Sequence, residues 1–249
     1  MICNKQLVVY SILLCVGFAT DIPLLTPIAQ KSWAQIPIEY VPPPGRRRAT
    51  HTEGAGSRGC NIDQAVKLKL IAPQDHVGLT TSAQPTFFWY VSQPTTLPMR
   101  FTLVEQDKPE PLVDSYFRLK QSGVVGFKLP TNTTLQLDKE YRWTVSLICN
   151  KQRPSANIYA FTWIRRLTLP ASSVLQLKEA ETNLEKGSVY ARAGLWYDAA
   201  ALLYEASFES GTQLEANYFW HLLEQINLGQ IRHQHSVIAP RKLSSNVEI

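Results

Sequence analysis

The sequence contains none of the short motifs that mark common enzyme classes. A G-x-S-x-G nucleophile elbow, an H-E-x-x-H zinc motif, a P-loop and a dinucleotide-binding fingerprint are all missing. Histidine is scarce, with five residues in 249. Of these, His233 and His235 are close neighbours, but two ligands on a polar tail do not make a metal site. We therefore expect no catalytic residue, no metal and no cofactor. A hydrolase would need His, Asp and Ser side chains clustered in a cleft.

Charge of one sign is not in large excess either. The chain has 25 lysines and arginines against 20 acidic residues, a formal net charge of +5. Its dense basic run, Arg46–Arg48, lies in a tract rich in proline and glycine, where a solvated linker is the simplest interpretation. Basic and aromatic residues are not interleaved on one face, as they are in proteins that bind nucleic acid. Nucleic acid is therefore not expected as a partner.

Long hydrophobic runs are absent except near the N-terminus. The run Leu7–Thr20 follows Lys5 and is too short to cross a bilayer comfortably, which is typical of the core of a secretory signal peptide. We predict a signal peptide over residues 1–34, cleaved after Ala34, with cleavage after Ala19 as an alternative. The mature protein is then exported to the periplasm or the extracellular space and has no transmembrane span. An uncleaved N-terminal anchor is the competing interpretation.

Cysteine is scarce as well, with four residues in the chain. Cys3 and Cys15 lie in or beside the apolar N-terminal run, so removal of the signal peptide leaves Cys60 and Cys149. Two cysteines in an exported protein point to one structural disulfide. Closing a loop of about 90 residues stabilises a fold by about 4 to 5 kcal/mol in the chain-entropy model.

Residues 35–59 are rich in proline and glycine and are predicted to be a disordered linker. Beyond them, short strand-like runs are separated by turn residues, with no helical pattern between them. The runs predict seven strands, at 65–72, 86–92, 99–106, 112–119, 123–129, 140–149 and 157–168. This spacing favours an antiparallel β-sandwich of the immunoglobulin or fibronectin type III kind over residues 60–170. If the seven strands run alternately up and down, the start of the first strand and the end of the sixth lie at the same end of the sandwich. Cys60 and Cys149 can meet there.

One local motif supports the sandwich. The segment Leu135–Tyr141 has the spacing of a tyrosine corner, in which a tyrosine at the start of the sixth strand hydrogen-bonds back to the preceding corner. Alternation along the strand places Tyr141 and Trp143 on one face and Arg142 on the other. We therefore expect Trp143, and likewise Trp163 in the last predicted strand, to be packed in the core.

After Pro170 the hydrophobic period changes from that of a strand to that of a helix. Four helices are predicted, from Ser172 or Ser173 to about Leu184, and at 185–193, 196–209 and 213–226. The segment Gly194–Leu203 alternates small and large residues as tetratricopeptide helix pairs do. One such unit is too short for a solenoid, so we expect a tetratricopeptide-like helical hairpin over residues 171–230, packed on the sandwich. The polar tail, 231–249, is predicted to be disordered.

Several blocks of sequence, taken together, are similar to those of a known family. They are Gly78–Thr80, Gln84–Val91, Tyr141–Trp143, Ser146–Asn150, Trp163–Arg166 and Tyr190–Ala199. In this order, and over roughly residues 58–230, they resemble the cyanobacterial family of exported proteins catalogued as domain of unknown function nine hundred and twenty-eight. Cys60 and Cys149 match the upstream and downstream cysteines of that family. The resemblance implies an exported cyanobacterial protein, and it implies no activity, cofactor or catalytic residue.

Aromatic residues supply the remaining functional signal. The last predicted strand, 157–168, is apolar on both faces, so we expect both faces to be covered. Phe88 and Tyr90 share one face of their strand, which either packs on the helices or is exposed. Together with Trp196 and Trp220 they are candidates for an exposed partner surface.

The α+β chain is therefore predicted to be a non-enzymatic extracytoplasmic protein-interaction module whose partner is another envelope or extracellular protein. The alternative is a module that binds a carbohydrate or an envelope polymer through exposed aromatic side chains.

Overall fold

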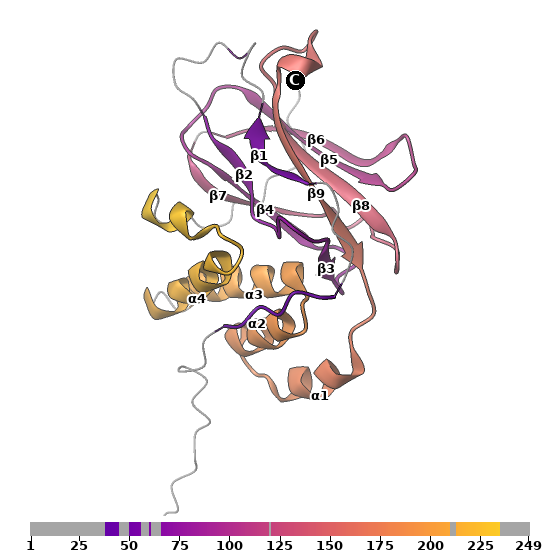
Figure 1. Ribbon diagram of the computed structural model, residues 1–249, viewed down its shortest axis with the longest axis vertical. Coiled ribbons are helices and arrows are strands. Elements are labelled where there is room, and N and C mark those ends of the chain that lie inside the picture. Colours follow the sequence, from indigo (N-terminus) through magenta and orange to yellow (C-terminus); the bar gives the residue numbers. More distant parts are fainter. Residues whose placement is uncertain are drawn as a thin grey trace, which may run out of the picture. The chain divides into compact units, whose positions relative to one another are not determined.

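Strands make up the first part of the fold and helices the last part (Figure 1). The computed structural model describes residues 38–44, 50–55, 60, 66–119, 121–209 and 213–234. All of these belong to one unit, Gln35–Ile249. The predicted signal peptide, 1–34, lies outside the described residues, as does the tail beyond residue 234.

Within the described residues, the strands form one curled, mainly antiparallel sheet. Their bounds are β1 His51–Ala55, β2 Leu68–Leu70, β3 Gly78–Thr80, β4 Thr86–Val91, β5 Pro98–Glu105, β6 Pro111–Arg118, β7 Gly123–Lys128, β8 Glu140–Leu147 and β9 Ile158–Arg166. The order across the sheet is β6-β5-β8-β9-β1-β2-β4-β7, and β3 pairs in parallel with β9 off this path. Each of the seven predicted strands has a counterpart, whereas β1 and β3 were not predicted.

The curl of the sheet brings its two arms face to face around an aromatic core. The ring centroid of Phe101 on β5 lies 5.1 Å from that of Phe87 on β4 and 4.6 Å from that of Phe127 on β7. The ring centroids of Trp89 on β4 and Phe117 on β6 are 5.5 Å apart. All five side chains are buried. Because every second residue of each strand points inward, the sheet closes into a half-barrel filled by aromatic rings, and the fold class is α+β.

The predicted hydrogen bond at the corner before β8 is confirmed. The hydroxyl of Tyr141 accepts a hydrogen bond of 2.9 Å from the backbone N–H of Gln136. Asp138, within the corner, has a φ of 60°, and its N–H donates to the carbonyl of Arg166 at 2.8 Å. Trp143 follows two residues after Tyr141 and is fully buried, as predicted. The corner therefore fixes the register of β8 at the edge of the core.

Four α-helices follow the sheet. They are α1 Ala171–Glu179, α2 Asn183–Arg192, α3 Trp196–Glu209 and α4 Gln213–Glu224, with short 3-10 segments η2 Pro154–Ala156 before β9 and η3 Gly229–Gln234 at the end. Thr182 and Glu185 form a capping box at the start of α2, which explains the break after α1. The disordered tail predicted from residue 231 is wrong for 231–234, because Ile231 is buried in η3. None of the described helices is long and apolar enough to span a membrane.

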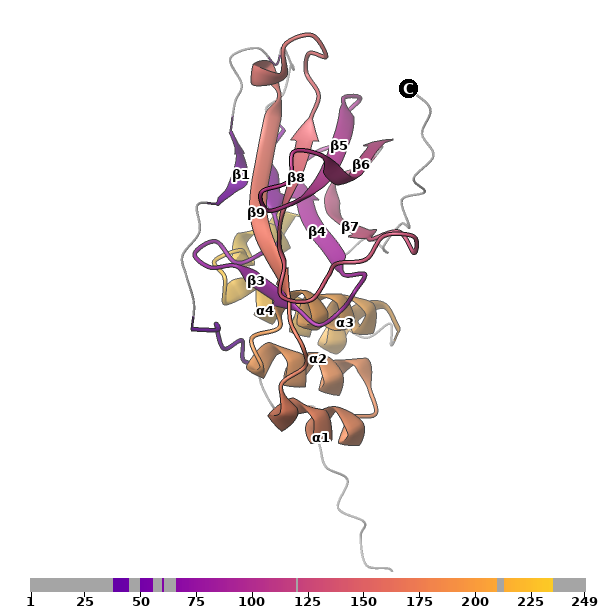
Figure 2. The ribbon, with the colours of Figure 1, turned by 90° about the vertical axis from the view of Figure 1, so that its right-hand side faces the viewer.

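The helices pack against one arm and one end of the half-barrel (Figures 1 and 2). On the outer side of β4, the ring centroid of Phe88 lies 4.7 Å from that of Tyr204 in α3 and 6.0 Å from that of Phe219 in α4. At the end of the half-barrel, the hydroxyl of Tyr197 in α3 accepts a hydrogen bond of 2.8 Å from the indole nitrogen of Trp143. The helices and the sheet therefore share one hydrophobic core.

Two parts of the predicted linker belong to the fold instead. Ile38 and Tyr40 are buried, and the side-chain amide of Gln225, just after α4, accepts from the N–H of Tyr40 and donates to the carbonyl of Ile38, both at 2.7 Å. β1 pairs with both β9 and β2 and so joins the two arms of the sheet. The linker prediction is therefore wrong for 38–44 and 50–55, because partners distant in sequence supply the burial that the local composition lacks.

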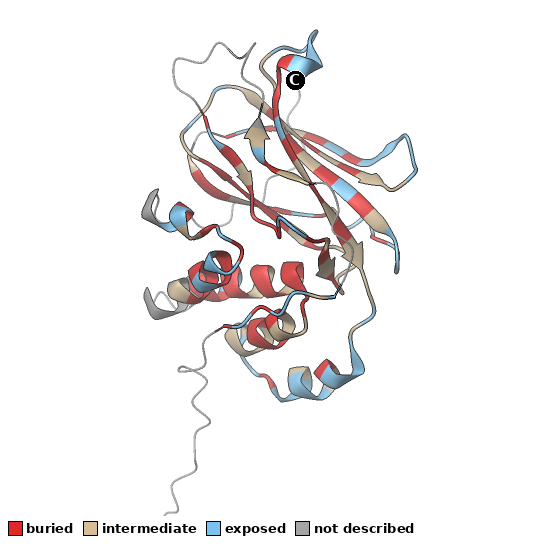
Figure 3. Cartoon of the chain, viewed as in Figure 1, coloured by how far each residue is buried: buried red, intermediate tan, exposed pale blue. Residues whose placement is uncertain are grey.

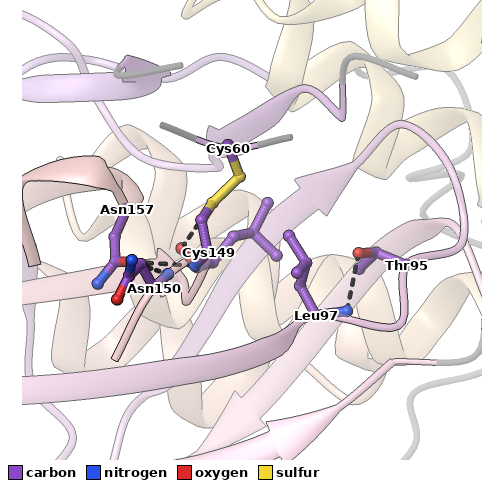
Figure 4. Close-up of a disulfide and its surroundings, with 7 residues drawn as sticks. Cys60, Thr95, Leu97, Cys149, Asn150 and Asn157 are labelled. Atoms are coloured by element: carbon purple, nitrogen blue, oxygen red, sulfur yellow. Dashed lines mark hydrogen bonds between the residues drawn. A yellow bond between two sulfur atoms is a disulfide. The ribbon is translucent and has the colours of Figure 1, made fainter. Parts of the chain in front are cut away.

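A disulfide joins Cys60 to Cys149, as predicted (Figure 4). The two cysteines are 89 residues apart in sequence, and their Cα atoms are 5.0 Å apart. The side-chain oxygen of Asn157 accepts hydrogen bonds from the backbone N–H groups of Cys149 and Asn150, at 3.0 and 3.1 Å. The disulfide thus ties the segment before β2 to the end of β8, where the chain is already held by a side-chain cap.

Candidate functional site

The four aromatic residues predicted to form a partner surface are buried. Phe88, Tyr90 and Trp196 are at most 2% exposed, and Trp220 is 5% exposed. The helices cover the face of β4 that carries Phe88, and the indole nitrogen of Trp196 donates a hydrogen bond of 3.2 Å to the carbonyl of Ile71. The prediction of an exposed surface is therefore wrong for all four residues, because they pack where the helices meet the sheet.

Aromatic side chains reach the solvent on another part of the sheet, along β9. Tyr159 is 43% exposed, and Phe161 and Trp163 are half-buried. They alternate with Ala160 and Thr162, which are fully buried, so they lie on the side of the sheet that faces away from the core. Figure 3 shows this change between buried and more exposed residues along the strands of the sheet. The prediction that both faces of this strand are covered is therefore wrong for this face, and so is the prediction that Trp163 packs in the core, because the helices cover a different part of the sheet.

The neighbouring strands extend this row into a surface that we call the outer aromatic face. It consists of His51 of β1, Arg142, Thr144 and Ser146 of β8, and Tyr159, Phe161 and Trp163 of β9. The strand register places Ser146, Thr144 and Arg142 opposite Tyr159, Phe161 and Trp163, in that order. On the other side of the row, the ring of His51 lies 5.8 Å from that of Tyr159 and 6.2 Å from that of Phe161, between centroids.

Arg142 supplies a positive charge near the middle of the outer aromatic face. Its side chain is exposed, and the carbon at the centre of its guanidinium group lies 5.8 Å from the ring centroid of Phe161. This distance is within the range of a cation–π contact. Thr144, two residues along β8, and Ser146 are half-buried, and their short hydroxyl side chains leave the aromatic rings beside them accessible. The face therefore combines flat apolar rings, hydroxyl groups and a cation.

A polar cleft of about 400 Å³ lies elsewhere, between α3 and the ends of β4 and β7. Its lining includes Thr81, Lys128, Tyr190, Asp198 and Glu205. Both carboxylate oxygens of Asp198 accept hydrogen bonds from Thr81, one from the backbone N–H at 3.0 Å and one from the hydroxyl at 2.8 Å. Burial raises the pKa of Asp198, and the hydrogen bonds from Thr81 oppose that rise. Asp198 thus anchors the start of α3 to the chain after β3.

The described residues that line the cleft do not form the cluster of His, Asp and Ser side chains that would indicate a hydrolase of the triad type. Histidine is not among the described residues that line it, so an Asp–His–Ser arrangement is not formed there. Across the described part of the chain, no three His, Cys, Asp or Glu side chains come together in a way that could hold a metal ion. His233 belongs to η3, and His235 lies outside the described residues.

A second polar group joins three residues on the helical side of the fold. The hydroxyl oxygen of Tyr40 lies 2.7 Å from Nε2 of His76, and Nδ1 of His76 lies 2.7 Å from a carboxylate oxygen of Asp75. Tyr40 precedes His76 by 36 residues, so tertiary packing brings the two side chains together. Burial, and to a lesser degree the charge of Asp75, raises the pKa of Tyr40. The contact of Tyr40 with His76 helps to hold the segment around Tyr40 on the fold.

Comparison with known proteins identifies a family and no activity. The family model described as Domain of Unknown Function (DUF928) matches residues 53–236. None of the curated proteins matches the chain. The matched range begins inside β1 and ends just after η3, so it includes the four helices and the outer aromatic face except His51.

Proposed function

The chain belongs to the family described as Domain of Unknown Function (DUF928), and since that membership brings no activity with it, we propose a function from the surface of the fold. The protein is a non-enzymatic extracytoplasmic interaction module that binds its partner through the outer aromatic face. The observation that carries this proposal is the partial exposure of Tyr159, Phe161 and Trp163 in one row. Contiguous apolar surface in contact with water commonly marks a binding site.

The partner is best described as a carbohydrate or another envelope polymer. A protein partner was expected from four aromatic residues that turn out to be buried, whereas the polymer alternative needs a row of accessible rings. Alternate residues of a strand are about 7 Å apart, a spacing of the order of one sugar unit, and each ring offers a flat apolar face. Thr144 and Ser146 add hydroxyl groups that both donate and accept hydrogen bonds. An envelope or extracellular protein is the competing partner, and the experiment below distinguishes the two.

Export to the periplasm or the extracellular space, after cleavage of residues 1–34, is part of the same proposal. The disulfide between Cys60 and Cys149 supports it, because disulfides persist mainly in oxidising compartments. The measurement is the intact mass of protein from the exported fraction. We expect a chain that begins at Gln35 and has no free thiol until it is reduced. A full-length chain with free thiols would overturn the assignment.

The proposal also assigns the finer architecture. The half-barrel is a variant of the immunoglobulin or fibronectin type III sandwich, and α2 and α3 are a tetratricopeptide-like pair. The hydrogen bond from Gln136 to the hydroxyl of Tyr141 supports the first assignment. The second is supported by Gly187 of α2, where an added Cβ would lie 2.8 Å from the side chain of Leu203 in α3. An experimental structure with two separate, facing sheets would support the sandwich, and one continuous wall would contradict it.

Trp163 makes the binding proposal directly testable. Of the five tryptophans that the structure describes, Trp163 alone is more than 5% exposed. The sixth tryptophan, Trp33, lies in the proposed signal peptide, so in a chain that begins at Gln35 quenching by acrylamide reports mainly on Trp163. We expect at least one polymer in a panel of envelope and extracellular polysaccharides to protect Trp163 from the quencher.

Two surface variants locate the binding site. Tyr159→Ala should weaken binding of that polymer by about tenfold, since it removes one stacking ring worth about 1 to 2 kcal/mol. Leu175→Ala, in α1, removes another exposed apolar side chain (69% exposed) and should leave binding unchanged. If no polymer protects Trp163, polymer binding is refuted. If an envelope protein is instead captured by the wild-type chain and lost in Tyr159→Ala, the partner is a protein.

A further inference from the structure

The charges on the outer side of the sheet are mostly paired. Arg100 of β5 donates two hydrogen bonds of 2.7 Å to the carboxylate of Asp114 on β6. Arg165, at the end of β9, lies 3.3 Å from a carboxylate oxygen of Asp138. By contrast, none of the described carboxylates lies within ion-pair distance of Arg142. Arg118 of β6 is also exposed and donates to the backbone carbonyl of Thr96. Arg142 therefore supplies a positive charge that is available to a ligand beside the aromatic row of β9.

The position of Arg142 relates this charge to the aromatic row. Arg142 lies opposite Trp163 in the register of β8 and β9, and its guanidinium group rests over the ring of Phe161. A guanidinium group stacked on a ring keeps its N–H donors in the plane of the group, where they remain available. A ligand that stacks on Phe161 and Trp163 thus places its own substituents within reach of a preordered cation.

We propose that the outer aromatic face binds an acidic polysaccharide of the uronate type, with its sugar rings on Tyr159, Phe161 and Trp163 and a uronate carboxylate on Arg142. This inference rests on the proposed function and names the ligand class for the same face. Pairs of arginine and carboxylate form some of the strongest hydrogen bonds in proteins, and their planar groups match. A neutral sugar would stack on the same rings but would leave the guanidinium group of Arg142 without a carboxylate.

The test compares two polymers that differ only in charge. Polygalacturonate carries a carboxylate on each sugar, and its methyl ester of the same chain length carries none. With protection of Trp163 as the readout, polygalacturonate should bind about tenfold more tightly than the ester. Raising the ionic strength from about 0.02 M to 0.3 M should weaken binding of the acid and leave binding of the ester unchanged.

Variants separate a specific contact from general attraction to a basic protein. Arg142→Gln should lower the affinity for polygalacturonate by about tenfold, to that of the ester, and leave the ester unaffected. Lys178→Gln removes the same charge from an exposed position on α1 and should change the affinity for polygalacturonate by less than about twofold. Equal stability of both variants in thermal melts serves as the control for folding.

The outcomes distinguish the binding of a polymer to the outer aromatic face from the preference of that face for an acidic polymer. Preference for the acid that is lost in Arg142→Gln and kept in Lys178→Gln supports the inference. Equal binding of acid and ester, with both weakened by Tyr159→Ala, overturns the acidic ligand and leaves the polymer-binding face intact. Preference for the acid that survives in Arg142→Gln overturns the role of Arg142. Failure of both polymers, and of the wider panel, to protect Trp163 overturns the proposed function as well.

Discussion

Removal of the disulfide between Cys60 and Cys149 should destabilise the protein strongly. The bond closes a loop of 89 residues, for which the chain-entropy model gives a loss of about 4.6 kcal/mol when the bond is absent. For a fold of this size, each kcal/mol shifts the melting temperature by about 2 to 4 °C. We therefore expect the double variant Cys60→Ser, Cys149→Ser to melt about 10 to 18 °C below the wild-type protein. The hydrogen bonds from Cys149 and Asn150 to Asn157 remain possible in the variant, so the change isolates the cross-link.

The assay is thermal unfolding of the purified protein, followed by circular dichroism with and without a reductant. Reduction should lower the melting temperature of the wild-type protein to that of the double variant and should not affect the double variant. A melting temperature that does not respond to reduction would refute the reasoning. So would alkylation of Cys60 and Cys149 before reduction, because the two thiols would then be free.

Three further predictions concern single side chains. Tyr141→Phe removes the acceptor of the N–H of Gln136 and should cost about 1 to 2 kcal/mol in urea unfolding, and a change near zero would show that the corner does not contribute to stability. Gly194→Ala should cost about 1 to 3 kcal/mol in the same assay, because Gly194 has a φ of 74° and an added Cβ would lie 2.9 Å from the carbonyl of Val41. Burial raises the pKa of Asp198 above its usual 3.8. Protonation of Asp198 therefore contributes to the stability of the fold below about pH 3.8, and this contribution is lost as the pH rises through the pKa of the folded state. Asp198→Asn should therefore gain stability relative to the wild-type protein between about pH 4 and 7, and the opposite trend in urea titrations would contradict this.

The strands that the sequence predicts well are those whose own residues decide their faces. In β8, Tyr141 and Trp143 alternate with Arg142 and Thr144, and the structure buries the first pair and leaves the second pair at least partly exposed. The bounds of α3 likewise match the prediction, since its helical period is carried by residues that are all buried on one side. The local hydrophobic pattern is sufficient to predict these two elements, because each only has to pack its apolar side against some other apolar surface of the fold.

Elements that depend on distant partners were missed. β1 contains His51, Glu53 and Gly54 and has no apolar alternation of its own, yet it pairs with β9 and with β2. β3 has three residues and is held by its parallel pairing with β9, which lies about 85 residues further along the chain by the register Gly78–Ile164. Such strands are set by tertiary pairing, and single-sequence patterns do not contain that information.

The candidate site was misplaced for a related reason. Alternation shows that Phe88 and Tyr90 lie on one side of β4, and that Tyr159 and Phe161 lie on one side of β9, but it does not show which side the helices cover. In the structure the first pair is buried, with Phe88 packed on α3 and α4, and the second pair is partly exposed. The signal that could have found the site was present in Arg142, a charged residue next to the aromatic row of a neighbouring strand.

The position of Tyr197 has a consequence for how this fold is inherited. Its hydroxyl group accepts from Trp143 at 2.8 Å and donates to the carbonyl of Trp163 at 3.4 Å. Gly78 makes room for the ring, since an added Cβ there would lie 2.6 Å from it. A sheet without the helices would leave the buried indole of Trp143 without its acceptor, and the helices alone would expose Tyr197. The two halves are therefore not interchangeable modules, and recombination between genes can transfer them only together.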